Sequence, residues 1–376
     1  MVETDGKLAG GAPIVGTRVL SYALHDLPRH ESATHLAYAK QIAALTGCIF
    51  AGSYNAIGQQ RNGMYFVPSR TLLIEEARRL GIRGADDLYG GVVPAEFVGT
   101  KAITHELVGP HAAAPAQWSF DFERQVRPIV HRGFTVFSMR DAQRVGEKLV
   151  LVGTVRVKPT RRRGAFGQAV VTNPAELMTV LTEIDEEEIQ SCGLVFEENL
   201  SSVNTWSVGT CRLAGMTIAY LGTQRLTTNN HGESVYGGSD LYLVRGDLQR
   251  LLAHELSHNA RLAVDQARLF DAAVGEFYPE VFASRRNYDV AQGVDWQGSW
   301  RSGVLEQSWR IGGATSAELL AFTALKGDPE LAAVRAASVE LYGDAHDVPL
   351  NAIVYFRGVD DRCGPMIKYA IRHADP

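Results

Sequence analysis

Several patterns that would assign a function directly are missing from this 376-residue sequence. The four cysteines form no C-x-x-C pair, which disfavours a disulfide framework or a zinc site and is typical of reduced thiols in a cytoplasm. No apolar run reaches the length of a membrane span, and the first residues lack the basic and apolar regions of a signal peptide. The net charge of −5 gives no reason to expect nucleic acid or a membrane as partner. We therefore expect a cytoplasmic protein.

Two common nucleotide-binding motifs are absent as well. Neither the P-loop pattern G-x-x-x-x-G-K-[ST] nor the dinucleotide pattern G-x-G-x-x-G occurs in the chain. The sequence also contains no internal repeat and no low-complexity segment. Hydrophobic residues make up 45% and charged residues 21%, which is ordinary for a globular protein. At this length we expect two or three domains with sizeable cores.

Strands and helices alternate in the first quarter of the chain. Strands are predicted at residues 17–23, 48–51 and 64–68, and helices closed by a glycine at residues 30–46 and 71–80. Such alternation favours a small parallel sheet. A loop rich in Gly, Asp and Pro, residues 81–94, then marks a boundary, so we predict an N-terminal α/β domain at residues 1–94. Its histidines His25, His30 and His35 are interpreted as incidental surface or cap residues.

A basic hairpin is the most specific element of the sequence. A strand ending at Lys158 leads into a loop with three consecutive arginines and the glycines Gly164 and Gly167, and the chain returns from Gln168. Glycines at a hairpin tip allow backbone N–H groups to contact phosphates, and a lysine on the strand adds a point charge. Lys101 also suits an anion, because it is predicted near a helix N-terminus. The alternative is a solvated hairpin whose arginines only keep it in water.

Two carboxylates and an arginine lie close together near residue 300. Asp295 and Glu306 are predicted on two short strands joined by a Gly/Ser turn, and Arg310 follows before a Gly-Gly corner that opens a helix. Paired carboxylates bind a hard divalent cation against phosphate oxygens, while an arginine balances developing negative charge. The alternative is an acidic surface hairpin with an ordinary ion pair.

These motifs follow one another in the order found in the ATP-grasp superfamily, which the chain resembles from about Gly90 to Leu320. The resemblance starts at Lys101 and continues with the Val-Lys-Pro strand and its glycine-rich lid loop. The segment Leu-Val-Phe-Glu-Glu-Asn-Leu, residues 194–200, resembles the hinge that holds adenine in that family. Val-Asp-Trp and Glu-Gln-Ser-Trp-Arg-Ile-Gly-Gly resemble its metal-binding end.

The resemblance implies a fold and a division into domains. The fold class is α/β, with a small parallel-sheet N-terminal domain followed by an ATP-grasp fold of α+β type at residues 95–345. A lid subdomain is implied at about residues 133–196. Residues 346–376 form a C-terminal closing segment, and we predict one helix after Asp328 and one closing strand.

The resemblance also implies roles for individual residues. The residues expected to bind ATP are Lys101, Lys158, Gly164, Gly167, Gln168, Glu197, Glu198 and Leu200. Asp295, Glu306 and Ser308 would bind magnesium, and Arg310 would face the transferred phosphoryl group. Arg286, or its neighbour Arg285, would bind a substrate carboxylate or phosphate.

Two residues depart from the family pattern. Ser308 stands where a metal-binding asparagine is usual, and Asn204 stands where an acidic residue facing the nucleotide is common. A hydroxyl binds magnesium directly or through water, so Ser308 weakens a second metal site rather than removing it. These departures leave open whether one or two metals bind and whether the activity is reduced.

The sequence-based hypothesis is an ATP-dependent ligase that joins a small-molecule carboxylate to an amine or thiol through an acyl phosphate, releasing ADP and phosphate. ATP and Mg²⁺ are the expected cofactors, and a homodimer is compatible with the sequence. A small-molecule kinase and a non-catalytic nucleotide-binding protein stay open as alternatives. The loop-like segment at residues 227–240 is expected either to be a flexible connector or to contact substrate through Asn229, Asn230, His231, Tyr236 and Ser239.

A competing motif is His-Glu-Leu-Ser-His at residues 254–258, which matches the zinc-peptidase pattern H-E-x-x-H. Its surroundings predict one amphipathic helix that begins after Asp247 and carries both histidines on its solvent-facing side. A zinc metallopeptidase is the weakest alternative, because it leaves the basic hairpin and the Asp295–Glu306 pair unexplained.

Overall fold

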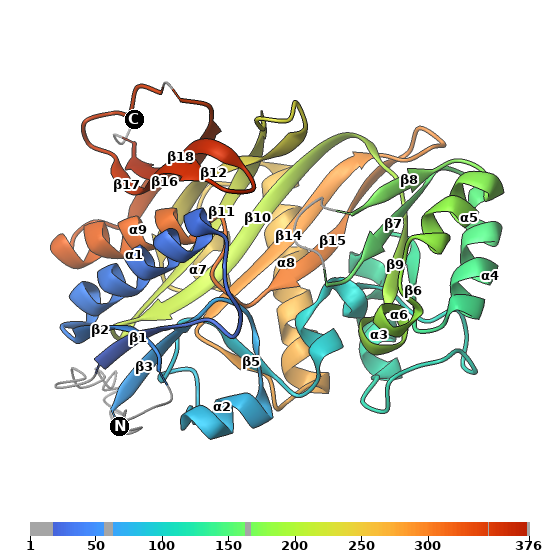
Figure 1. Cartoon of the computed structure of the whole chain (residues 1–376), viewed down its shortest axis with the longest axis horizontal. Coiled ribbons are helices and arrows are strands. Elements are labelled where there is room, and N and C mark those ends of the chain that lie inside the picture. The colour runs from blue at the N-terminus through green and yellow to red at the C-terminus, as the bar shows by residue number, and fades with distance from the viewer. Residues whose placement is uncertain (1–17, 56–62, 162–166, 345, 374–376) are drawn as a thin grey trace, which may run out of the picture.

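The chain folds around one large antiparallel sheet (Figure 1), and the computed structural model describes residues 18–55, 63–161, 167–344 and 346–373. The strand order in this sheet is β15-β14-β10-β11-β12-β16-β18-β17. The strands are β10 (Ser201–Leu213), β11 (Met216–Thr228), β12 (Ser234–Arg245), β14 (Arg285–Val294), β15 (Trp300–Ser308), β16 (Ala333–Tyr342), β17 (Ile353–Asp360) and β18 (Gly364–Arg372). Every neighbouring pair is antiparallel, so residues on adjacent strands face one another in a fixed register.

A three-stranded parallel sheet precedes the large sheet. Strand β1 (Arg18–Tyr22) pairs in parallel with both β2 (Ile49–Ser53) and β3 (Met64–Pro68). Helix α1 (Arg29–Thr46) connects β1 to β2 and ends at Gly47, whose φ of 71° is the left-handed conformation that favours glycine. The small parallel sheet expected from the alternating pattern is therefore confirmed.

A second small sheet, with the order β13-β5-β4, links this N-terminal part to the large sheet. Its strands are β4 (Leu72–Leu73), β5 (Gly91–Val93) and β13 (Phe282–Ala283). Helix α2 (Ile74–Leu80) begins directly after β4. The short helices η1 (Glu96–Gly99), η2 (Lys101–Thr104), α3 (Phe120–Val126) and η3 (Arg127–Ile129) follow β5. Because β13 directly precedes β14, its pairing with β5 positions the start of β14.

A four-stranded sheet with the order β6-β9-β7-β8 lies beside the β15 edge of the large sheet (Figure 1). Its elements are β6 (Gly133–Val136), α4 (Met139–Val150), β7 (Val155–Pro159), β8 (Ala169–Val171), α5 (Pro174–Thr182), α6 (Glu186–Cys192) and β9 (Leu194–Glu198). Its separate core includes Val157, Leu177 and Phe196. These elements occupy the range expected for the lid subdomain, and we use that name for residues 133–198.

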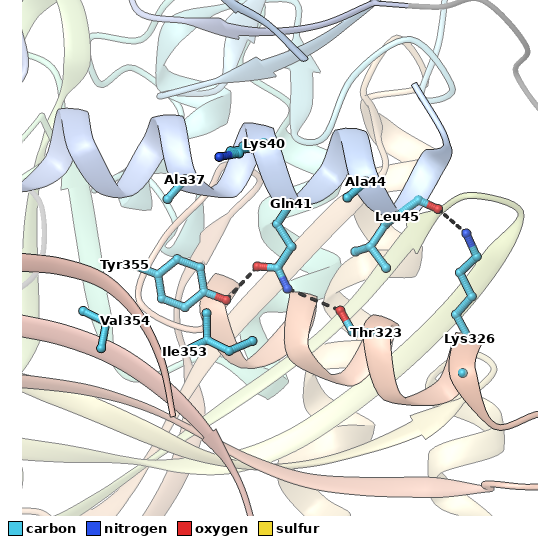
Figure 2. Close-up of a pocket in the computed structure, with 11 residues that line it drawn as sticks. Ala37, Lys40, Gln41, Ala44, Leu45, Thr323, Lys326, Ile353, Val354 and Tyr355 are labelled. Atoms are coloured by element: carbon cyan, nitrogen blue, oxygen red, sulfur yellow. Dashed lines mark hydrogen bonds between the residues drawn. The ribbon is translucent and has the colours of Figure 1, made fainter. Parts of the chain in front are cut away.

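Helix α9 (Thr315–Gly327) and helix α1 cover one face of the large sheet. The Gln41 amide of α1 donates to the Thr323 hydroxyl of α9 at 3.3 Å and accepts from the Tyr355 hydroxyl of β17 at 2.7 Å (Figure 2). Lys326 Nζ donates to the Leu45 carbonyl at 2.7 Å. These contacts cross an open groove between α1, α9 and β17 and attach the N-terminal part to the sheet.

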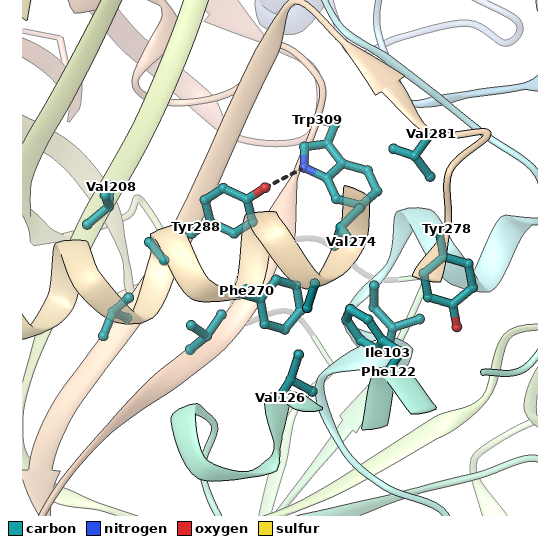
Figure 3. Packing of buried hydrophobic residues seen from close by; sticks show 14 of the residues in the cluster. Ile103, Phe122, Val126, Val208, Phe270, Val274, Tyr278, Val281, Tyr288 and Trp309 are labelled. Atoms are coloured by element: carbon teal, nitrogen blue, oxygen red, sulfur yellow. Dashed lines mark hydrogen bonds between the residues drawn. The ribbon is translucent and has the colours of Figure 1, made fainter. Parts of the chain in front are cut away.

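Helix α8 (His258–Phe277) packs against the other face. Phe270 of α8 lies beside Tyr288 of β14, and the Trp309 indole N–H donates to the Tyr288 hydroxyl at 3.3 Å (Figure 3). Side chains alternate between the two faces along a strand. Asn287 and Asp289, the neighbours of Tyr288, therefore point away from α8.

The chain after Asp328 differs from its prediction. The expected helix is strand β16, which pairs with β12 on one side and β18 on the other. This double pairing satisfies the backbone N–H and C=O groups of β16, and it outweighs the helix propensity of the alanines in the segment. Strands β17 and β18 of the expected closing segment also join the large sheet.

Two further observations concern the cysteines and the helices. Cys48, Cys192, Cys211 and Cys363 are all free thiols. Within the described ranges, no helix is long and apolar enough to cross a membrane.

Candidate active site

Two carboxylates face each other across strands β14 and β15. Asp289 is the antiparallel partner of Glu306, because an irregularity in the register after Asp289 places Glu306 and not Leu305 opposite it. The Asn287 amide donates to Asp289 Oδ1 at 2.9 Å. Burial and the charge of Glu306 raise the pKa of Asp289 to about 6, while hydrogen bonds from Gln224 and Asn287 lower it less strongly. Two carboxylates in one half-buried site favour a proton or a metal cation between them.

Buried lysines from two other elements lie against this pair. Lys101 Nζ, at the start of η2, is 2.9 Å from Glu306 Oε2, and Lys158 Nζ, on β7, donates to Glu197 at 2.5 Å. Burial lowers the pKa of Lys158, and the carboxylate of Glu197 opposes this effect. Burial raises the pKa of Glu306. The charges of Lys101, Lys158 and Arg310 outweigh that effect and hold the Glu306 pKa below its ordinary value. Positive charge from three elements therefore converges on Glu306.

The segment expected to be the adenine-binding hinge comprises the end of β9 and residues 199–200, between the lid subdomain and the large sheet. Glu197 lies within 3.0 Å of His105 Nε2 as well as bonding Lys158. Burial raises the pKa of Glu197, but Lys158 and His105 outweigh it and hold the pKa well below its usual range. Glu198 accepts from the Arg132 backbone N–H at 3.2 Å. Leu200 directly precedes β10, so the expected adenine-lining residues all lie where the two sheets join.

Asp295 does not belong to the carboxylate pair. It lies in the turn of the β14–β15 hairpin, where Oδ1 accepts the backbone N–H groups of Gln297 and Ser299 at 2.9 Å each. Its Oδ2 accepts from Arg301 Nε at 2.8 Å. The length of strand between Asp289 and Asp295 corresponds to about 20 Å. The expected Asp295–Glu306 pair is therefore wrong, because β14 and β15 are longer than the short strands expected from the sequence. The partner of Glu306 is Asp289, which the sequence pattern did not predict.

Ser308 lies on the same face as Glu306 and opposite Asn287. The side-chain amide of Asn287, on the adjacent strand, therefore lies beside Ser308. Asn287 Oδ1 accepts from the hydroxyls of Ser207 and Tyr220 at 2.8 Å each, so its side chain is held in place. Asn204, the other departure, is exposed on β10 opposite Gln292, whereas the β10 residue opposite Asp289 is Ser207.

The two candidate substrate-binding arginines on β14 are engaged elsewhere. Arg286 points to the α8 face, where it donates to Asp271 at 2.6 Å. Arg285 is fully buried, and its guanidinium donates twice to Glu318 of α9, at 2.7 and 2.9 Å. The structure does not bring Arg286 to the carboxylate pair, because successive residues of a strand face opposite sides of the sheet.

Arg310 borders a cavity of about 780 Å³. Gly167 of the lid loop lines it too, whereas Gly164 lies outside the described residues. Gln168, after Gly167, accepts from Arg156 at 3.4 Å. The other walls come from α1, from the turn between β11 and β12, from Ile311 to Gly313, from β16 and from the β17–β18 hairpin. The cavity therefore continues from the lid loop to the N-terminal domain.

The segment at residues 227–240 is mostly strand and not loop. Strand β11 ends at Thr228 and β12 begins at Ser234, so only a tight turn separates them. Asn229, His231 and Tyr236 line the cavity. Asn230 instead donates to the carbonyls of Cys363 and Pro365, and Ser239 is buried beneath Tyr236. Three of the five expected substrate contacts therefore reach the cavity.

The H-E-x-x-H motif does not lie on a single helix. Helix α7 (Leu248–Leu252) ends before it, and α8 begins at His258, with the Ser257 hydroxyl as its N-cap. The expected single helix is therefore wrong. A zinc-peptidase motif requires both histidines on one face of one helix, and His254 bonds instead to the Tyr242 hydroxyl at 3.0 Å. The geometry does not support the peptidase alternative.

A family model with the description "Protein of unknown function (DUF3182)" matches residues 19–370. The chain belongs to this family. No curated protein sequence matches this DUF3182 chain significantly.

Solved structures share the fold of this DUF3182 chain. N5-carboxyaminoimidazole synthetase from Staphylococcus aureus, complexed with ADP, is 10% identical at a TM-score of 0.53, with 96% of this chain and 94% of that chain covered. Biotin carboxylase from Campylobacter jejuni, in a β-γ-ATP complex, is 9% identical at a TM-score of 0.52, with 95% of this chain and 88% of that chain covered. Phosphoribosylamine–glycine ligase from Thermotoga maritima is 14% identical at a TM-score of 0.50, with 95% of this chain and 90% of that chain covered. The chain has the ATP-grasp fold, as expected.

Proposed function

We propose that this chain is an ATP-dependent ligase that activates a small-molecule carboxylate as an acyl phosphate and joins it to an amine or thiol. The observation that carries the proposal is the Asp289–Glu306 pair, which faces buried lysines between the lid subdomain and the large sheet. Two proteins with the same fold are nucleotide complexes, which supports a nucleotide as the ligand. The free thiols support a cytoplasmic location as part of the proposal.

The donor set fits ATP with magnesium. Magnesium takes oxygen ligands, commonly one or two carboxylates together with phosphate oxygens, and Asp289 and Glu306 supply such carboxylates. The Ser308 hydroxyl on the same face is a further oxygen donor. When bound, magnesium would stabilise the negative charge that develops on the transferred phosphoryl group.

The chain's own residues would bind and orient the nucleotide. Lys101 and Lys158 are already buried and held by carboxylates, so little reorganisation is needed when phosphates take over those contacts. Glu197, Glu198 and Leu200 at the hinge would line the adenine. Gly167 and Gln168 would close over the phosphates with the lid loop.

The cavity beside Arg310 would hold the carboxylate substrate and the nucleophile. Arg310 lines the cavity, and its charge also lowers the pKa of Glu306. It therefore lies between the cavity and the carboxylate pair. In this position its guanidinium would orient the carboxylate for attack on the γ-phosphoryl group. It would then stabilise the oxyanion that forms when the amine or thiol attacks the acyl phosphate.

Trapping with hydroxylamine tests this proposal. An acyl phosphate is a mixed anhydride that hydroxylamine converts to a hydroxamate, whereas a phosphorylated hydroxyl is inert. We expect equal amounts of ADP and hydroxamate when the protein meets its carboxylate, ATP, magnesium and hydroxylamine. ADP with a stable phosphorylated product and no hydroxamate from any carboxylate would establish the kinase instead. Absence of nucleotide binding by calorimetry would overturn both.

A further inference from the structure

Three side chains with metal-binding atoms meet at the wall of the large cavity. His30 lies in the first turn of α1, Asp360 ends β17, and Cys363 lies in the turn between β17 and β18. One ligand atom from each lies within 4.8 Å of the other two, and within the described ranges no other group of three His, Cys, Asp or Glu side chains does so. His30 and Cys363 also line the cavity. The cluster is thus a second candidate site, formed by residues far apart in the sequence.

The two softer donors of the cluster make few competing hydrogen bonds. His30 Nε2 faces Cys363 Sγ at 3.8 Å, while the buried His30 Nδ1 has no hydrogen-bond partner among the described residues. The imidazole is only 7% exposed. Burial and the charge of Lys368 lower the pKa of His30, which favours the neutral ring that metals bind. With the ring proton on Nδ1, the lone pair of Nε2, which faces Cys363, is available to a cation.

Asp360 supplies an ionised oxygen donor to the same place. Its Oδ2 accepts from the His30 backbone N–H at 2.9 Å, and its Oδ1 accepts from the backbone N–H groups of Arg362 and Cys363 at 2.9 and 3.1 Å. Burial raises the Asp360 pKa, but these hydrogen bonds outweigh it and lower the pKa to about 2. Each carboxylate oxygen has about two lone-pair sites, so Oδ2, which accepts a single hydrogen bond, keeps one for a cation. The same bonds fix the carboxylate beside the imidazole and the thiol.

We propose that His30, Asp360 and Cys363 bind a zinc-type divalent cation at the wall of the cavity. A mixed nitrogen, sulfur and oxygen donor set is typical of zinc. Tetrahedral zinc with ordinary Zn–N and Zn–S bonds separates the two donor atoms by about 3.6 Å, close to the 3.8 Å between His30 Nε2 and Cys363 Sγ. The side chains need to move only slightly to bind the ion.

The surrounding charges permit a cation. Lys368 is the nearby positive charge that acts on His30, and its Nζ is paired with Glu340 Oε2 at 3.0 Å. Binding would also ionise the Cys363 thiol, whose pKa is raised by burial and by Asp360. The proton is released to solvent, so the cation gains a thiolate and a carboxylate as ligands.

Three protein ligands leave a fourth tetrahedral position, as in catalytic zinc sites. Because His30 and Cys363 line the cavity, this position faces the space proposed for the nucleophile. An amine or thiol bound there would lose its proton more easily. This part of the inference rests on the proposed ligase function, whereas the metal site itself does not.

Cobalt binding without any nucleotide tests the site. Cobalt(II) replaces zinc, and a thiolate ligand gives it a sulfur-to-cobalt charge-transfer band in the near ultraviolet. We expect the full-length wild type to bind one equivalent with this band, and zinc to abolish the band by competition. Cys363→Ser should lose the band, and His30→Gln should weaken cobalt binding at least about tenfold.

Matched variants separate this site from the active site. Cys48→Ser changes another half-buried thiol, and Glu306→Gln changes the proposed magnesium site, so both should keep the band. Absence of the band in the wild type, or its persistence in Cys363→Ser, would overturn the site. Circular dichroism of Cys363→Ser checks that the variant folds, and a normal spectrum makes loss of the band specific. Since no ATP is present, the result does not depend on whether the ligase proposal holds.

Discussion

Asp289 and Glu306 are direct neighbours across strands β14 and β15, on the face of the large sheet that points away from α8. Like charges in this position are destabilising. The protein relieves the repulsion in two ways, since Asp289 has a raised pKa and Glu306 lies 2.9 Å from Lys101 Nζ. A magnesium ion between the two carboxylates would relieve the repulsion further. We therefore expect the pair to bind a cation.

Exchanging single carboxylates on the β14–β15 hairpin tests which of them bind magnesium. Asp289→Asn and Glu306→Gln should each lower magnesium-dependent ADP formation about 100- to 1,000-fold, because each removes charge stabilisation at the phosphoryl group. Asp295→Asn is the matched control, since Asp295 only caps the turn and pairs with Arg301. It should keep its activity and lower the Tm. Loss of activity in Asp295→Asn with a normal Asp289→Asn would restore the original assignment.

The stability of the metal-free protein should depend on Asp289. The folded chain holds this proton up to a pH of about 6, whereas an exposed aspartate releases it near 3.8. The folded state therefore binds more protons in that window, and the free energy of unfolding falls as the pH rises through it. Asp289→Asn removes this fall in the free energy of unfolding, because the amide does not ionise. The variant should therefore have a higher Tm than the wild type at neutral pH without divalent cations.

Magnesium should remove the difference in Tm between Asp289→Asn and the wild type. Binding to the ionised pair raises the Tm of the wild type, and the effect grows as the pH rises through about 6 because the proton no longer competes. Thermal unfolding with and without magnesium at several pH values measures both effects. A wild type that is more stable than Asp289→Asn at neutral pH without cations would contradict this prediction.

Arg310 and Arg286 should behave differently, although both were expected at the site. Arg310→Ala should lower the rate of hydroxamate formation about 100-fold, because it removes the cation proposed for the reacting oxygens. Arg286→Ala should leave that rate unchanged and lower stability by about 1–3 kcal/mol, because the partly buried Asp271 carboxylate loses its charged partner. Urea unfolding and the trapping assay provide both numbers. Equal activity losses in the two variants would contradict the assignment.

The buried pair between Arg285 and Glu318 should be important for stability. Arg285→Met should cost about 3–5 kcal/mol, because it removes the cation paired with the buried Glu318 carboxylate and leaves neutral donors such as Tyr89 and Tyr220. The double variant with Glu318→Met should lose less than the sum of the single losses. Denaturant unfolding of the three variants measures this coupling, and additive losses would show that the two residues act independently.

Much of the candidate site followed from local sequence. Lys101, Lys158 and Glu306 were recognised from the strand and glycine patterns around them, and the structure brings all three together. Asp289 was missed because nothing in the run Asn-Tyr-Asp distinguishes it from other aspartates. Its partner is set by the register of a hairpin, and Asp295 had the more obvious position beside the turn. A one-residue change in register exchanges the faces of a strand, so the pattern alone could not decide the pair.

The histidines of the N-terminal domain also show that local sequence does not predict contacts between distant segments. His30 and His35 were interpreted as surface or cap residues, yet both are buried, and His30 meets Asp360 and Cys363. Helix α1 was predicted correctly from its length and its Gly47 stop signal. Its contacts with Asp360 and Cys363 were not predictable, because the chain forms β17 and β18 only at its far end.

The sequence by itself determined the parallel sheet and the helix α1 at the start of the chain and the basic and acidic motifs, since these depend on periodicity, glycine stop signals and short motifs. The tertiary structure decided which side chains meet. The pairing of β14 with β15 selected Asp289, the alternation of side chains turned Arg286 away, and the docking of α1 on the β17–β18 hairpin placed His30 beside Cys363. Each depends on register or packing between distant segments, which local composition does not encode.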